Sequence, residues 1–91
     1  MSELLVEHNP SPLKLEVLGV DDWPVRTENV STFSARYETT EVSFVTAGEA
    51  IITTQSGESI LVREGDIITC MPGLNCSWAI KEMLTRHYRV A

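Results

Sequence analysis

Most of the chain consists of short runs of hydrophobic and β-branched residues separated by turn residues such as Gly48, Ser56-Gly57 and Gly65-Asp66. β-Branched side chains suit a pleated sheet and lose conformational freedom in a helix, so these runs predict strands. The predicted strands cover residues 25–30, 33–37, 41–47, 49–54, 59–62, 67–70, 75–80 and 84–90. Eight short strands with hairpin-length connections predict an all-β fold, a double-sheet jelly-roll barrel.

The segment before Pro24 has a different pattern. Ser11 is a helix-capping residue, Pro12 suits the first helical position, and Gly19 ends the run, so a short helical turn is predicted between them. Residues 1–10 carry no such pattern and are expected to be a flexible or loosely docked leader. No internal repeat, linker or low-complexity segment occurs, which predicts a single domain over residues 1–91.

Composition narrows the possible partners. Thirteen acidic and seven basic residues give the 91-residue chain a formal net charge of -6, which disfavours binding to nucleic acids and to anionic membranes. There is no signal-peptide pattern and no run of 18 apolar residues, so we expect no membrane insertion and a cytoplasmic location. Cys70 and Cys76 are the only cysteines and are expected to be reduced.

Two spaced patterns carry a family resemblance. They are Glu41-x6-Gly48 and Gly65-Asp66-x6-Gly73-x2-Cys76, followed by Trp78 and by Arg86-His87-Tyr88. In this order they resemble the small single-domain cupins. The chain is most similar to the cupin domains of ureidoglycine aminohydrolase and of the ethanolamine-utilisation cupin. The resemblance covers roughly residues 12–90 and implies a cupin-type barrel with an interior site.

The metal ligands of that family are largely missing here. Metal cupins hold a divalent ion with three histidines and one glutamate, and Glu41 matches the glutamate. The other ligand places fall on Ala35 and Tyr37 or on Ser34 and Arg36, and on Cys76. A zinc-like ion needs three or four convergent ligands, so we expect no cofactor and no tightly held metal. Glu41 and Cys76 remain as candidates for weak divalent-metal binding.

The two-residue period of a strand indicates which side chains share the interior. If Glu41 points inward, Ser43 and Val45 do so too, whereas Val42 and Phe44 face outward. By the same period Cys76 lies on one face with Trp78, and Arg86 on one face with Tyr88, which the resemblance turns inward. The candidate ligand-binding residues are therefore Tyr37, Cys76, Trp78, Arg86 and Tyr88, with Glu41 as the candidate catalytic residue.

Each candidate has a structural and a functional interpretation. Glu41 can form a buried ion pair with Arg86 or serve as an acid or base. Cys76 can be an inert core residue or a nucleophile, although no histidine lies at a position that would activate it. Trp78 and Tyr88 can be core aromatics or stack on a ligand. The planar guanidinium of Arg86 matches a carboxylate or a similar anion.

Three functions follow from these interpretations. The first is a cupin that binds a small polar or anionic metabolite. The second is an enzyme, a hydrolase or isomerase of a nitrogen-containing molecule similar to ureidoglycine aminohydrolase, with Glu41 as acid or base. The third is a structural or interaction domain with a packed barrel. Apolar residues expected on the exterior, namely Val42, Phe44, Ile52 and Ile60, also predict a homodimer.

Overall fold

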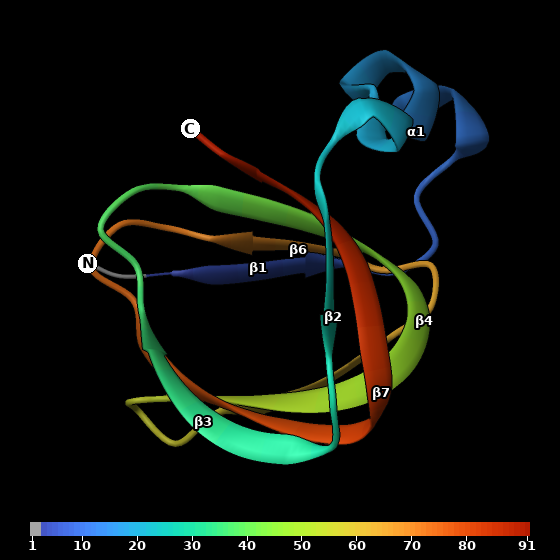
Figure 1. The fold of residues 1–91 in the computed structure, drawn as a ribbon. Helices are drawn as coiled ribbons and strands as arrows, with labels where there is room; N and C mark the ends of the chain where they lie inside the picture. Colours follow the sequence, from blue (N-terminus) through green and yellow to red (C-terminus); the bar gives the residue numbers. More distant parts are fainter. Residues whose placement is uncertain (1–2) are drawn as a thin grey trace.

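The computed structural model describes residues 3–91, which form seven strands, one short α-helix and a 3-10 turn (Figure 1). The elements are β1 (Leu4–Glu7), α1 (Pro12–Leu18), η1 (Val20–Asp22), β2 (Val25–Glu28), β3 (Ser31–Arg36), β4 (Glu41–Thr54), β5 (Ser59–Arg63), β6 (Ile67–Cys70) and β7 (Asn75–Val90). Among these residues no helix has the length and apolar character needed to cross a membrane.

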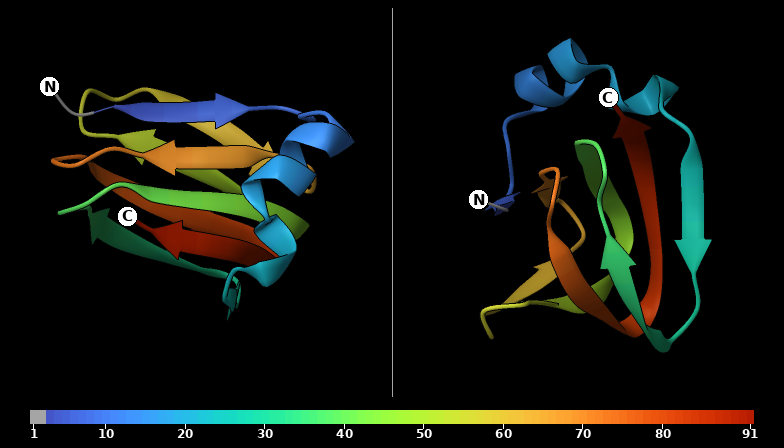
Figure 2. Two further views of the ribbon diagram at one scale, coloured as in Figure 1. Left: turned by 90° about the horizontal axis from the view of Figure 1, so that it is seen from above. Right: turned by 90° about the vertical axis from the view of Figure 1, so that its left-hand side faces the viewer.

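The strands build two antiparallel layers that share β4 and β7. The first part of β4 pairs with β6 and with the last part of β7, and β1 and β2 complete that layer. The second part of β4 pairs with β5 and with the first part of β7, whose other neighbour is β3. Both long strands curve from one layer into the other (Figure 2). The predicted double-sheet jelly roll is confirmed.

The helix forms where its capping signals predict it. The Ser11 hydroxyl accepts a hydrogen bond from the Lys14 backbone N–H at 3.2 Å, and Gly19 closes the helix with a φ of 71°. The segment α1–η1 lies outside the barrel (Figure 1). His87 contacts it, because its Nδ1 lies 2.9 Å from the Val20 carbonyl oxygen. His87 thus faces away from Arg86 and Tyr88, as the strand period predicts.

Gly48 lies inside a continuous strand, whereas the sequence pattern predicted a turn between two strands. Its φ is +92°, and the β4–β7 register shifts between Val45 and Ala50, which marks a β-bulge. A Cβ at this position would lie 2.1 Å from the Met83 carbonyl oxygen. A glycine therefore lets β4 bend sharply while its backbone packs directly on β7. The predicted strands 75–80 and 84–90 are likewise joined, as β7.

The bulge also changes which residues of β4 face the interior. Before the bulge the odd-numbered residues Ser43 and Val45 are buried. After the bulge the even-numbered residues Ala50 and Ile52 are buried instead. The prediction that Ile52 faces outward is therefore wrong, because Ile52 is fully buried. Ile60 pairs with Ile52 and packs against the core, so it does not belong to the outer face either.

The N-terminal segment contains a strand that the sequence pattern did not indicate. Leu4–Glu7 forms β1, which pairs with β6 at the edge of the first layer, whereas residues 1–10 were expected to be a flexible or loosely docked leader. Residues 1 and 2 of that leader lie outside the described residues. The His8 side chain also contacts the buried Asp66 carboxylate, with 2.9 Å between Nδ1 and Oδ1.

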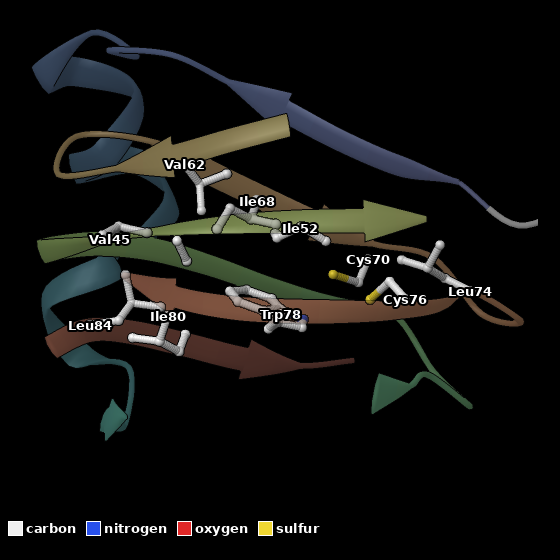
Figure 3. Packing of buried hydrophobic residues seen from close by; sticks show 11 residues of the cluster. Val45, Ile52, Val62, Ile68, Cys70, Leu74, Cys76, Trp78, Ile80 and Leu84 are labelled. Carbon is white, nitrogen blue, oxygen red and sulfur yellow. The ribbon is translucent and has the colours of Figure 1, made fainter. Parts of the chain in front are cut away.

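The space between the two layers is filled by one hydrophobic cluster (Figure 3). It consists of Val45, Ala50, Ile52, Val62, Ile68, Cys70, Leu74, Cys76, Trp78, Ile80 and Leu84. Trp78 occupies the middle of the cluster, and the two cysteines lie together at one end beside Leu74. The barrel interior is therefore a packed core rather than an open cavity, and any ligand site must lie beside it.

We predict that Gly48→Ala destabilises the protein far more than Gly57→Ala. Both glycines have positive φ values, but a Cβ on Gly57 meets no atom within 4 Å. Gly57→Ala should therefore lower the free energy of unfolding only through the strain of a left-handed backbone conformation, by about 1 to 2 kcal/mol. Gly48→Ala adds a backbone clash and should cost about 1 to 3 kcal/mol more. Urea unfolding of both variants measures the difference, and equal losses would show that the close β4–β7 approach does not constrain the fold.

Candidate functional site

Arg86 and Glu41 form an ion pair inside the barrel. Nη1 of Arg86 donates hydrogen bonds to Glu41 Oε2 at 3.1 Å and to Ser43 Oγ at 2.7 Å. The exposed fractions of the Arg86 and Glu41 side chains are only 7% and 18%. The antiparallel register of β4 and β7 produces this contact. Val45 lies opposite Arg86, and both side chains are buried. Glu41 and Ser43 lie on the same face of β4 as Val45, so they face the Arg86 side chain. The predicted pairing of the two groups is confirmed.

Two aromatic rings enclose the guanidinium. The Cζ atom of Arg86 lies 5.4 Å from the ring centre of Trp78 and 5.6 Å from that of Tyr88. Cation–π attraction of this kind strengthens when water is excluded. Phe33 in turn stacks nearly parallel on Trp78, with ring centres 6.2 Å apart. Trp78 and Tyr88 therefore position Arg86, and Trp78 also belongs to the core.

Arg86 keeps unused hydrogen-bonding capacity. Its Nε is buried and has no hydrogen-bond partner within residues 3–91. A buried donor without a partner costs about 1 to 3 kcal/mol, more when it is charged, and such groups call for an explanation such as a bound ligand. The Arg86 side chain also lines a pocket, whereas Nε itself is enclosed by protein atoms.

This pocket has a volume of about 250 Å³ and opens between β2 and β3, the edge strands of the two layers. Its walls are Arg26, Glu28, Phe33, Ser34, Ala35, Tyr37, Glu41 and Arg86. Three of the six residues predicted for the site therefore share one pocket: Tyr37, Glu41 and Arg86. Cys76 and Trp78 belong to the core cluster, and Tyr88 packs against Arg86.

Sequence reasoning missed Arg26 and Glu28. Arg26 lies directly opposite Arg86 in the β2–β7 register, and Glu28 lies two residues further on the same face. Their side chains form an ion pair, with 2.6 Å between Arg26 Nε and Glu28 Oε1. The two-residue spacing of an arginine and a glutamate was visible in the sequence. Only the pairing of β2 with β7, however, shows that this face meets the pocket.

Tyr37 contributes a neutral hydroxyl. Trp78 Nε1 donates a hydrogen bond to Tyr37 Oη at 3.1 Å. Burial is the main cause that raises the pKa of Tyr37 far above its ordinary value, and the neighbouring Cys70 adds to the shift. The phenol therefore stays protonated at neutral pH, and its O–H can donate to an acceptor in the interior.

The two cysteines are free thiols in the core. Burial raises the pKa of Cys70 to about 12, and burial also raises the pKa of Cys76. The thiolate is the nucleophilic form of cysteine, so both side chains are poor nucleophiles at neutral pH. The geometry thus favours the interpretation of Cys76 as an inert core residue.

The donor set does not suit the divalent ion of metal cupins. Ala35 in β3 and Tyr37 directly after β3 are partly buried and pack against the core, whereas Ser34 and Arg36 are exposed. An alanine and a tyrosine therefore occupy the two histidine places. Within residues 3–91 no three His, Cys, Asp or Glu side chains converge as a metal site would require. Glu41, which matches the glutamate ligand of metal cupins, instead accepts a hydrogen bond from Arg86.

A second and larger cavity, of about 680 Å³, lies on the other side of the barrel. Like the smaller pocket it is half open to solvent, and it lies between β1, the β4–β5 hairpin and the start of β7. Hydroxyl, amide and carboxylate groups with three apolar side chains line it, and none of the predicted site residues does. We assign the candidate site to the smaller pocket, because that pocket contains a buried guanidinium with an unused donor.

Comparison with known protein families gives one match. The model of the EutQ-like cupin domain matches residues 15–88. A comparison with curated proteins found no match.

Solved structures give a consistent result. A DUF861 family protein from Thermotoga maritima is 34% identical, with a TM-score of 0.94, and the alignment covers 98% of this chain and 100% of that one. The EutQ protein of Clostridium difficile aligns at 14% identity and a TM-score of 0.68, over 98% of this chain and 68% of that one. A putative ethanolamine utilization protein Q from Salmonella typhimurium aligns at 17% identity and a TM-score of 0.66. That alignment covers 72% of this chain and 53% of the Salmonella chain, so only about half of the latter is matched.

The raised thiol pKa values predict a loss of stability in alkali. Between the ordinary thiol pKa of 9.0 and about 12, Cys70 is protonated when folded and ionised when unfolded. The folded state then binds more protons, so the free energy of unfolding falls as pH rises, by about 1.4 kcal/mol per pH unit for each such thiol.

Urea unfolding between pH 8 and 10.5 should therefore give a shallower alkaline slope for Cys70→Val than for the unsubstituted protein. Thr69→Val, at the neighbouring and non-titrating position, serves as the matched control and should keep the original slope. An unchanged slope in Cys70→Val would contradict the assignment.

Proposed function

The chain belongs to the EutQ-like cupin family, and we propose that it binds a small polar or anionic metabolite in the pocket beside Arg86. One observation carries this proposal. The Arg86 guanidinium is buried at the pocket wall and uses only Nη1 for its two recorded side-chain hydrogen bonds, while Nε has no partner in residues 3–91. A planar cation at the wall of an open pocket suits a carboxylate or a similar anion.

The surroundings of Arg86 support binding. The two aromatic rings and Ser43 hold the guanidinium in one orientation, so little side-chain entropy remains to be lost when a ligand binds. Glu41 is partly exposed and can accept hydrogen bonds from polar groups of the ligand. The pocket is therefore preorganised and polar, and it lies next to a rigid core.

Two alternatives find less support. A packed interaction domain agrees with the filled interior but leaves the pocket and the unpaired Nε unexplained. An enzyme similar to ureidoglycine aminohydrolase would need a reactive group. Both thiols have raised pKa values, and Glu41 is held by Arg86. The resemblance to EutQ proteins below 25% identity concerns the fold alone, so we transfer no activity from them.

We also propose that the protein forms a homodimer in a reducing compartment such as the cytoplasm. Leu5, Thr69 and Val42 follow one another across β1, β6 and β4 on the outer face of the first layer. Leu5 is half exposed and Val42 is partly exposed. A second copy would cover the two apolar side chains on either side of Thr69. The two free thiols suit reducing conditions.

Binding should depend on Arg86 and need no added metal. We predict that at least one compound in a panel of small carboxylates and amino acids shifts the NMR signal of the Arg86 Nε–Hε group in EDTA-treated protein. Arg86→Lys keeps the charge but loses the planar donor fork, so affinity should fall about tenfold or more.

Arg89→Lys is the matched control, because Arg89 is exposed on the same strand. It should bind like the unsubstituted protein. If Arg86→Lys fails to fold, the Nε–Hε titration of the unsubstituted protein decides alone. The proposal fails if no compound shifts that signal.

The dimer has its own test. We predict a dimeric mass in solution and a shift towards monomer in Val42→Glu, since the substitution would place a charge in the buried interface. Leu61→Glu, at an exposed leucine on β5 in the second layer, should leave the mass unchanged. Light scattering after size-exclusion chromatography measures both variants, and a monomeric mass for the unsubstituted protein would exclude the dimer.

A further inference from the structure

We infer that the ligand of the pocket between β2 and β3 is a small zwitterion, a molecule that carries both a carboxylate and a cationic nitrogen group. The inference rests on the proposed binding function and adds the chemical class of the ligand. It starts from the charge of the pocket. Two arginines and two glutamates line it, namely Arg26, Arg86, Glu28 and Glu41. The pocket is thus neutral overall in a chain with a net charge of -6.

The two arginines form a cross-strand pair of like charges, in which Arg86 is buried and Arg26 is exposed. Arg26 and Arg86 lie directly opposite each other on neighbouring strands, and like charges in such a pair are destabilising. Each is offset by its own carboxylate, at 2.6 Å for Arg26–Glu28 and 3.1 Å for Arg86–Glu41. A ligand carboxylate close to both guanidinium groups would relieve their repulsion and would accept charge-assisted hydrogen bonds from them.

The two glutamates exclude a simple anion as the best ligand. An anion that approaches the arginines also comes close to Glu28 and Glu41, whose side chains are only 21% and 18% exposed and therefore poorly screened. A cationic N–H group on the same ligand would offset this repulsion and donate to those carboxylates. A simple cation would in turn meet the two guanidinium groups. Only a ligand with both charges matches all four side chains.

The pocket is small and half open to solvent, so it encloses only a short molecule or a short part of one. About 250 Å³ corresponds to the space of about eight water molecules. Phe33 and Ala35 form the apolar part of the wall, against which a short methylene spacer between the two charged groups would pack.

Four small compounds of similar size test the charge pattern: β-alanine as the zwitterion, propionate as the anion, propylamine as the cation and malonate as the dianion. Their affinities are measured by NMR titration of the unsubstituted protein, with the Arg86 Nε–Hε signal as the readout. We expect β-alanine to bind about tenfold or more tightly than propionate, because it adds a charge-assisted hydrogen bond. Propylamine and malonate should bind more weakly than β-alanine.

Glu28→Gln should remove most of the preference for β-alanine over propionate. Glu38→Gln is the matched control, since Glu38 is exposed and does not line the pocket, and it should keep the preference. If propionate or malonate shifts the Arg86 signal with an affinity equal to or above that of β-alanine, the zwitterion inference is overturned while the proposed binding function stands. If none of the four compounds, nor any in the wider panel, shifts that signal, both are overturned.

Discussion

A buried guanidinium is the constraint on which the rest of this barrel depends. Removing a charged group from water costs several kcal/mol unless it is paired and hydrogen-bonded. Arg86 meets this requirement through Glu41, Ser43 and two aromatic rings. Both rings come from β7 itself, whereas the contacts with Glu41 and Ser43 require the start of β4 and the end of β7 to keep one register. A slip of one residue would turn Arg86 outward and leave Glu41 in the interior without its partner.

The fold was predictable from the sequence, but the continuity of its long strands was not. Turn residues and β-branched runs identified nearly every strand, and Ser11 and Gly19 marked the helix. The sequence pattern placed Gly48 in a turn, but a glycine with a positive φ is equally suited to a hairpin turn and to a β-bulge. Only the close approach to Met83 separates the two cases, and that contact spans a distance in sequence that no local pattern covers. The same bulge reversed the expected facing of Ile52.

The site was predictable where it follows the period of a long strand. Glu41 and Arg86 were assigned from that period and from the family resemblance, and the structure joins them. Arg26 and Glu28 lie on β2, a four-residue edge strand with three exposed residues, which has no apolar face to show which side turns inward. Their orientation comes from pairing with β7, and a single sequence does not contain that pairing.

The division of the barrel into a packed interior and a polar rim explains how one small domain can combine stability with binding. The core of this 91-residue chain is small, and the cluster around Trp78 fills the space between the layers. The ligand space then lies at an edge of the barrel, between β2 and β3, which each pair with β7 but not with each other. Arg86 belongs to both regions, because it contacts the core residue Trp78 and also lines the pocket. A substitution there would therefore affect folding and binding together, and Arg26 and Glu28, outside the core, are the positions at which binding can change alone.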